Sequence, residues 1–558
     1  MHKRKIWQIV AWVLFGTAAI AFVVGQCVHY QAGANADLAS DLLLAKYLAE
    51  GRGFILSDQW FYSTEVHFIH NQLIFTPLFW LFGDNWFLVQ VGGSVIMNGL
   101  MLAALWYLLK SMRADRLFPW LGTLLLLPLG YEYGHFISFS GAYTVYIAMA
   151  MLILGMVIWA LRAKTKRTRY ALIAGAAVLT LLDSVGGIRH LVTLAAPLFG
   201  GAVLFWLFNL RSERRGTAQL LFWSALICLT AALIGLFINQ QLANVLHFDP
   251  HYKTFHFFPD FFTARFDWRA LFNRWSSFVR VFGFELEPGE NLLLRVLLNC
   301  IALDYLGFYL FTTVAILVRQ KRYSAGTVLL TWFTLLGMLM LMAVVTLTDI
   351  EYYVRFYLPA AVFCLPVCAL WLAGNLRLFS QFRQFMAKLT WGVMLVFASI
   401  YYVQFYACHN WVWCRVPSDE LYMVTQKLVA DGYHAGYSSF YSYNVITQFS
   451  RGKIEMYGFQ NLVTADFDDL YLWLQLVEHA DQRPTGKVFF LVDAEIGESV
   501  LPIPHQLRQA AADHLLDYGS ERYLIFGFDS VQELLDCGIY HSKPLAAAQN
   551  LVGVAGNC

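Results

Sequence analysis

The sequence predicts an α-helical polytopic membrane protein that carries a small α/β domain at its C-terminal end. Of its 558 residues, 59% are hydrophobic and only 14% are charged, with a mean hydropathy of +0.53. A soluble protein of this length carries about a quarter charged residues. Long apolar runs recur over the first three-quarters of the chain, and Lys and Arg gather in every second connection between them.

The apolar runs predict about eleven transmembrane helices. Most reach the ~20 residues that cross a bilayer core, and a spanning segment in lipid must be helical because no water satisfies its backbone. Residues 6–28 end without a small-residue cleavage site, so we expect a retained first span rather than a signal peptide. The predicted spans are 6–28, 86–109, 117–129, 142–161, 171–182, 191–210, 218–238, 296–318, 328–347, 356–373 and 389–406.

The basic connections predict the orientation in the cell membrane. If MHKRK is cytoplasmic, alternation through the spans places about half of the 39 Lys and Arg residues in inner segments, with only two acids. The positive-inside rule therefore predicts a cytoplasmic N-terminus and an extracytoplasmic C-terminal domain. The inner segments are 1–5, 110–116, 162–169, 211–215, 319–322 and the stretch holding Arg377, Arg383 and Lys388.

Two predicted outer loops, 29–85 and 240–295, are too long to be simple connections, and loops of this length usually carry function. Within the first, Leu and Ala recur at helical spacing over 37–50, which predicts an amphipathic helix that GRG terminates. Residues 73–82 are too short to span and contain Pro77, which predicts an interfacial helix. Residues 1–414 thus form the predicted transmembrane domain.

Residues 415–558 are predicted to form a small extracytoplasmic α/β domain, the C-terminal domain. SDELYMVTQKLVADG predicts a helix, KVFFLVD and RYLIFGF predict buried strands, and SVQELLDC predicts a short helix. The stretch 435–450 is rich in aromatic residues, which could stack on sugars or pack in the domain core. Cys408 and Cys414 could close a short loop, although spacing alone does not fix their pairing.

Acidic and histidine residues concentrate in the first outer loop. Asp37 and Asp41 are four residues apart, on one face of a helix, where two carboxylates raise each other's pKa and can hold a proton, a cation or a hydroxyl group. The alternative is a solvated acidic helix start, which the helix dipole favours. Glu65, His67 and His70 follow in SDQWFYSTEVHFIHNQLIF and extend the candidate site.

Basic partners come from distant segments. GIRHL places Arg189 and His190 at the outer mouth of one span, and DIEYYVRFYLP places Arg355 at another. An arginine at membrane depth costs ~2.5–3.5 kcal/mol, so it faces protein or a water-filled cavity. Its planar fork of donors matches a phosphate. The alternatives are headgroup anchoring or ion pairs with Asp183 or Glu351.

His247, Asp249, His251 and His256 are residue types that could bind a divalent metal. Their spacing fits no standard signature, and Pro250 prevents a continuous helix, so we expect polar decoration of an interfacial segment and no cofactor. The sequence contains no Gly-rich phosphate loop and no nucleic-acid motif. For a membrane protein of this kind we expect membrane lipids as partners, and no nucleic acid.

Several stretches resemble the GT-C fold, whose members are polytopic glycosyltransferases that use lipid-phosphate sugar donors. HNQLIFTPLFWLFGDNW, followed by a span and KSMR, is similar to a segment of the arabinosyl-, mannosyl- and aminoarabinose-transferring branches. YVRFYLP is similar to their Arg-Tyr-Leu-Pro-like sequence. LLLAKYLAEG, SDQWFYSTEVHFIHNQLIF and GYSSFYSYNVITQFSRGKIE resemble a group of bacterial membrane proteins described as glycosyltransferase-like.

The resemblance implies inverting transfer of a sugar from a polyprenyl-phosphate donor to a hydroxyl group of a cell-envelope glycan, lipid or protein. It makes Asp37 the first candidate for the general base and Asp41 the second, although their Asp-x-x-x-Asp spacing departs from the commoner pattern. Arg355, helped by Arg189, would hold the lipid phosphate. The other residues expected to bind substrate are Glu65, His67, His70 and His190.

Two other functions are open at this point. A transporter or flippase for lipid-linked saccharides would place polar or broken segments at the bilayer midplane. Here the polar residues gather at the outer mouth of the spans, which favours surface chemistry. A non-catalytic membrane scaffold could instead use the C-terminal domain to bind a partner.

Overall fold

The computed structural model describes residues 2–63, 66, 68–127, 131–139, 141, 143–248, 275–276, 278–284, 292–348, 353–375, 392, 396, 417–459, 471–494 and 512–537. Several predicted features lie outside these residues. They are Glu65, His67, Asp249, His251, His256, Glu351, the span 389–406 apart from residues 392 and 396, and Cys408 with Cys414.

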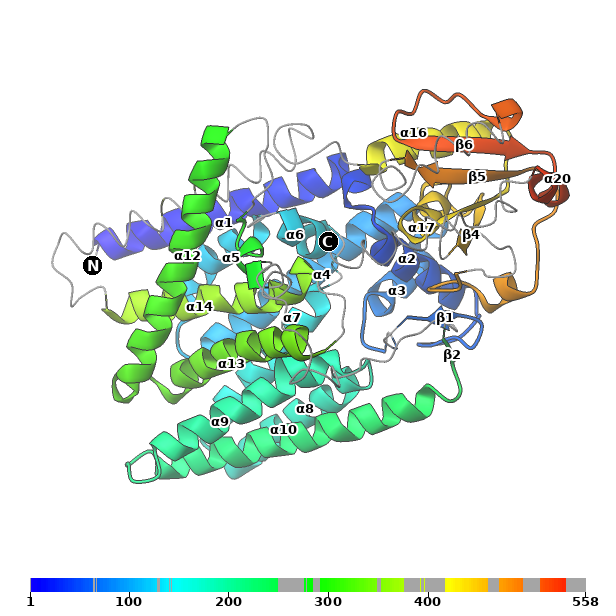
Figure 1. Cartoon of the computed structure of the whole chain (residues 1–558). Helices are drawn as coiled ribbons and strands as arrows, with labels where there is room; N and C mark the ends of the chain where they lie inside the picture. The colour runs from blue at the N-terminus through cyan, green and yellow to red at the C-terminus, as the bar shows by residue number, and fades with distance from the viewer. Residues whose placement is uncertain are drawn as a thin grey trace, which may run out of the picture.

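Most of the long helices lie side by side and form a bundle, α12 crosses its neighbours steeply, and the C-terminal domain lies at one end of the bundle (Figure 1). The largest hydrophobic core of the protein is inside this bundle. The bundle helices are α1 (His2–Val28), α4 (Trp86–Ser111), α5 (Phe118–Leu126), α7 (Thr144–Ala160), α8 (Lys166–Ser184), α9 (Ala196–Phe208), α10 (Arg215–Leu242), α12 (Leu292–Val318), α13 (Ala325–Leu347) and α14 (Leu358–Asn375).

Within the described residues, seven helices are long and apolar enough to cross a membrane, and each corresponds to a predicted span. The predicted spans 117–129, 142–161 and 171–182 are helical over shorter or more polar stretches, as α5, α7 and part of α8. The chain is therefore a multi-pass membrane protein, while the exact number of spans stays a prediction.

The basic loops that connect the bundle helices are joined to one another by hydrogen bonds. The Arg214 Nη1 atom donates to the carbonyl oxygens of Gln320 and Tyr323, at 3.1 and 2.9 Å, and the Arg162 guanidinium donates to the Ser111 carbonyl. The N-terminus of α1 lies at the end of the bundle away from the C-terminal domain (Figure 1). The side of the membrane on which each end lies stays a prediction.

Helices α2 (Ala36–Ala49) and α3 (Gln72–Phe82) lie between the bundle and the C-terminal domain (Figure 1). Both predicted helices of the first outer loop are therefore confirmed, and Asn35 caps α2 by accepting a hydrogen bond from Leu38 N at 2.9 Å. The expected amphipathic character of α2 is wrong. Its Leu, Ala, Ser40 and Asp41 side chains are mostly buried, because the C-terminal domain contacts Ala39 and Ser40 while His70 and Asn71 contact Asp41.

The C-terminal domain is built on a four-stranded sheet with the order β4-β3-β5-β6. Its strands are β3 (Ala435–Ser439), β4 (Glu455–Phe459), β5 (Val488–Asp493) and β6 (Tyr523–Phe528), and β6 alone among these four runs antiparallel to its neighbour. The helices are α16 (Pro417–Ala430), α17 (Phe440–Phe449) and α20 (Val531–Asp536). The predicted strands β5 and β6 and helices α16 and α20 are confirmed, whereas β3, α17 and β4 were not predicted.

Backbone pairing joins the outer loops to the C-terminal domain. Strand β1 (Phe61–Tyr62) runs parallel to β2 (His247–Phe248), which connects the first outer loop to the start of the second. The Phe61 amide donates to the Gln475 carbonyl at 2.7 Å, and the Val477 amide donates to the Gln59 carbonyl at 3.0 Å. The segment around β1 therefore bonds β2 through its backbone and also residues 475–477 of the C-terminal domain.

Helices α8 and α10 approach closely at a glycine. A Cβ atom added at Gly235 would lie 2.5 Å from the backbone oxygen of Leu181 and 2.9 Å from the Ser184 Cβ. Small residues permit such close approach between membrane helices, whose association depends on packing.

We expect Gly235→Ala to lower the free energy of unfolding by about 1–3 kcal/mol, because the new methyl group meets backbone that cannot rotate away. Gly216→Ala in the same helix is the matched control, since a Cβ there meets nothing within 4 Å. Thermal unfolding of the detergent-solubilised protein measures both variants. Equal shifts in the two melting temperatures would contradict this account of the α8–α10 contact.

Candidate active site

Asp37 and Arg355 meet although they come from opposite ends of the membrane domain. Asp37 lies in the first turn of α2, and Arg355 lies in the short helix η6 (Val354–Tyr357) that leads into α14. The Arg355 Nη1 atom is 3.4 Å from the Asp37 Oδ2 atom, and the two side chains are 25% and 34% exposed. The pair is therefore partly desolvated, yet the carboxylate stays accessible.

Aromatic rings fix the Arg355 guanidinium. Its central carbon lies 4.4 Å from the ring centroid of Tyr353 and 4.8 Å from that of Phe136. Such cation–π contacts hold the planar group in one orientation. Phe136 belongs to η3 (Gly134–Phe139), a π-helical turn that follows the short helix α6 (Tyr131–Tyr133).

Polar side chains of three bundle helices support η3. Gln26 of α1 donates to the Ser138 carbonyl at 2.8 Å, and Asn98 of α4 donates to the Ile137 carbonyl at 3.1 Å. The hydroxyl of Thr144, at the start of α7, donates to the same Ile137 carbonyl at 3.1 Å. Buried backbone groups must be paired, and these side chains pair carbonyl groups of η3 inside the helical bundle.

The α6–η3 segment adds two titratable groups that our sequence reasoning missed. Burial raises the pKa of the Glu132 carboxyl, while the positive charges of Arg355 and Arg280 oppose that rise. Burial lowers the pKa of His135 to about 4, and the charge of Arg355 acts in the same direction. The sequence signal for them is YEYGHF, an acid and a histidine around a glycine between two apolar runs.

Asp41 has partners other than those of Asp37. Its side chain is 1% exposed, and its Oδ2 atom accepts a hydrogen bond from the Asn71 amide at 2.9 Å. The same oxygen lies 3.1 Å from the Nδ1 atom of His70, which is also buried. Residues of α3 and of the loop before it therefore cover Asp41, whereas Asp37 contacts Arg355.

A second buried acid–histidine pair lies nearby. The His190 Nδ1 atom is 2.8 Å from the Asp183 Oδ2 atom, and both side chains are nearly inaccessible. The Tyr146 ring contacts both histidines, with centroid distances of 5.1 Å to His70 and 4.8 Å to His190. The alternative that Asp183 pairs with an arginine is not what the structure shows.

Arg189 shares these aromatic residues. Its guanidinium carbon lies 5.2 Å from the Tyr143 ring centroid and 5.3 Å from that of Tyr146. Arg189, His70 and His190 therefore contact one tyrosine, Tyr146. The structure thus forms two groups of predicted site residues. Asp37 contacts Arg355, and His70, Arg189 and His190 gather around Tyr146.

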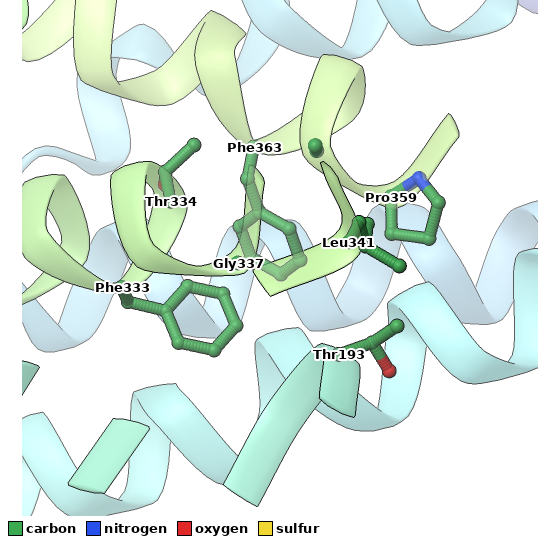
Figure 2. A pocket seen from close by; sticks show the side chains of 8 residues that line it. Thr193, Phe333, Thr334, Gly337, Leu341, Pro359 and Phe363 are labelled. Carbon is green, nitrogen blue, oxygen red and sulfur yellow. The ribbon is translucent and has the colours of Figure 1, made fainter. Parts of the chain in front are cut away.

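A small apolar crevice is lined by residues that follow each of the two arginines along the chain. Thr193, four residues after Arg189, and Pro359, four residues after Arg355, both line it. Figure 2 shows Thr193 on one side of the crevice and Leu341 and Phe363 on the other. Its full lining is Thr193, Phe333, Thr334, Gly337, Leu341, Pro359, Ala360 and Phe363.

In the part of the chain that the structure describes, three or more His, Cys, Asp or Glu side chains never gather as they would around a metal ion. His247, the one described member of the predicted histidine-rich stretch, packs against Phe61 with ring centroids 5.7 Å apart. This observation concerns the described residues only, so the prediction that the protein needs no metal stays a prediction.

The fold is that of a polytopic membrane protein with a small C-terminal α/β domain. Its overall fold matches solved structures. The match to ArnT from Cupriavidus metallidurans bound to undecaprenyl phosphate has a TM-score of 0.55 at 10% identity, over 92% of this chain and 97% of that chain. The apo state of the same protein gives 0.53 at 10% identity, over 94% and 98%.

The Archaeoglobus fulgidus oligosaccharyltransferase in complex with Zn and sulfate matches with a TM-score of 0.50 at 13% identity, over 87% of this chain and 68% of that chain. No family model matches the sequence, and no curated protein matches it. At these identities the likeness shows the fold, and the chain has the GT-C fold that its sequence motifs predicted.

The different surroundings of the two aspartates predict different effects on stability. We expect Asp41→Ala to lower the free energy of unfolding by about 1–3 kcal/mol, because it removes the buried acceptor of Asn71 and the partner of His70. Asp37→Ala is the control and should cost at most about 1 kcal/mol, since its ion pair is partly exposed. Thermal unfolding of the two variants in detergent compares them. A larger loss of unfolding free energy for Asp37→Ala than for Asp41→Ala would contradict the burial of Asp41 and the exposure of Asp37.

Proposed function

We propose that this protein is an inverting membrane glycosyltransferase that moves a sugar from a polyprenyl-phosphate donor to an acceptor hydroxyl on the extracytoplasmic face. The observation that carries the proposal is the contact between the partly exposed Asp37 carboxylate and Arg355, whose guanidinium lies against two aromatic rings. The GT-C fold supports it, and so does the undecaprenyl phosphate that the similar ArnT structure binds.

Asp37 is the proposed general base. Its carboxylate takes the proton of the acceptor hydroxyl while that oxygen attacks the anomeric carbon of the donor sugar. The bond between the anomeric carbon and the phosphate oxygen breaks, its electron pair stays on the phosphate, and the configuration inverts. Asp37 suits this role better than Asp41, because about a third of its side chain is exposed whereas Asp41 is buried.

Arg355 is the proposed ligand of the lipid phosphate. A guanidinium held by two aromatic rings presents its donors in a fixed direction, and charge-assisted hydrogen bonds stabilise the negative charge that grows on the leaving phosphate. Arg189 would assist from the other side of the site.

The buried residues have supporting roles in this proposal. Asp41 orients His70 and Asn71, and Asp183 orients His190, so the two histidines hold Tyr146 and thereby the aromatic surface under Arg189. Glu132 is the second acid near Arg355, and its carboxyl retains a proton at higher pH than an ordinary glutamate. The acceptor would be a glycan, lipid or protein of the cell envelope.

We expect Asp37→Asn to reduce the transfer rate by about 10²–10⁴-fold, the usual contribution of a general base. Release of polyprenyl phosphate from defined polyprenyl-phosphate sugars by the purified protein in liposomes measures this rate. Asp84→Asn is the matched control, because Asp84 lies in the same outer loop and pairs with Lys46 at the surface. Full activity of the Asp37→Asn variant would exclude Asp37 as the base.

For Arg355→Ala we expect the KM for the lipid donor to rise tenfold or more, since a hydrogen bond to a charged group contributes about 1.5–3 kcal/mol. Arg355→Lys should show a smaller rise, because it keeps the charge and loses the planar fork. Steady-state kinetics over a range of donor concentrations separates KM from kcat. A KM that does not change in either variant would reject the phosphate-binding role.

A further inference from the structure

The C-terminal domain reaches the acidic helix α2 through one buried amide. Asn444 lies in α17, is 2% exposed, and donates from its Nδ2 atom to the Ser40 hydroxyl at 2.7 Å and to the Leu474 carbonyl at 3.0 Å. The side-chain amide of asparagine has two hydrogens to donate. Both donors of Asn444 are therefore used, one on its own domain and one on α2.

The contact continues to the first residue of α2. The Ser40 hydroxyl donates to the Ala36 carbonyl at 2.6 Å, and Ser40 is 1% exposed. Because its own hydrogen goes to Ala36, the Ser40 oxygen accepts from Asn444. A continuous chain of hydrogen bonds thus runs from the C-terminal domain to Ala36, the residue next to Asp37.

The first turn of a helix is the part that needs this support. Helix ends open more easily than the middle, and the Ser40 hydroxyl bonds the Ala36 carbonyl of this turn. Asp37 lies in that turn and must meet Arg355 from a different element. A small tilt of the turn would separate the two side chains without unfolding α2.

We propose that Asn444 is a positioning residue of the active site, which acts through Ser40 to hold the first turn of α2 so that Asp37 faces Arg355. This inference rests on the proposed function of Asp37. It makes the C-terminal domain part of the machinery of transfer, in addition to any contact with the acceptor.

A neighbouring residue provides a matched control. Gln448, one helical turn after Asn444, is 4% exposed and donates from its Nε2 atom to the Gln90 Oε1 atom of α4 at 2.8 Å. It is also a buried amide of α17 that bonds the membrane domain, but its partner is remote from Asp37 in sequence and lies in another helix. If Asn444 only attaches the C-terminal domain, the two residues should behave alike.

The experiment compares Asn444→Ala, Ser40→Ala, the double variant and Gln448→Ala in the full-length protein. We expect Asn444→Ala to lower kcat about tenfold or more, because small misplacement of a reacting group is costly, with the donor KM within twofold of the wild type. Ser40→Ala should lower kcat in the same way. The kcat of the double variant should be no lower than that of the less active single variant, because both residues act through one chain of hydrogen bonds. Gln448→Ala should leave kcat within twofold.

Hydrogen exchange provides a readout that does not depend on transfer. The amides of residues 36–41 should exchange faster in Asn444→Ala and Ser40→Ala, and at the wild-type rate in Gln448→Ala. Equal losses of kcat in Asn444→Ala and Gln448→Ala, or unchanged exchange at 36–41 in Asn444→Ala, would overturn the proposal. If the wild-type protein transfers none of the sugars, the proposed function fails, and exchange at 36–41 still decides whether Asn444 holds the turn.

Discussion

The candidate site depends on the burial of α2 between the membrane bundle and the C-terminal domain. A helix covered on both sides cannot roll or slide, so the direction of each of its side chains is fixed. Asp41 is thereby directed into the protein, toward His70 and Asn71, and Asp37 is left at the edge where Arg355 reaches it. The division of labour between the two acids follows from this packing, since their chemistry is identical.

The irregular segment η3, which contacts Arg355 through Phe136, depends on hydrogen bonds that pair its backbone groups. A π-helical turn within a helical bundle leaves carbonyl groups without helical partners. Amide and hydroxyl side chains of α1, α4 and α7 pair those groups at η3, and the turn can then present Phe136 to the guanidinium. Polar residues that hydropathy alone would treat as imperfections of the spans are thus the supports of the site.

The sequence predicted those elements for which hydrophobicity and length allow only one secondary structure. An apolar run in lipid must be a helix, and the uniformly apolar β5 and β6 must be buried strands. It missed β3, α17 and β4, because residues 435–459 mix aromatic, small and polar side chains that reflect contact with α2 as much as strand periodicity. It assigned Asp37 and Arg355 to one candidate site through the family resemblance, but it did not predict that the two side chains form an ion pair. It missed Glu132 and His135, whose segment between two apolar runs carries no periodic signal. For Asp41, helical spacing gave the face but could not reveal what covers it.

The contact between Asp37 and Arg355 also bears on how a lipid donor would be used. Without substrate, the carboxylate of Asp37 balances the charge of the largely buried Arg355 guanidinium, which is costly to leave unpaired. In the proposed reaction, the phosphate of the donor brings its own negative charge to Arg355 and competes with Asp37 for the same donors. Asp37 then loses its ion pair and is free to accept the proton of the acceptor hydroxyl. One arginine would thus couple occupation of the donor site to the availability of the base, so that a donor sugar meets an activated acceptor only after its phosphate is bound.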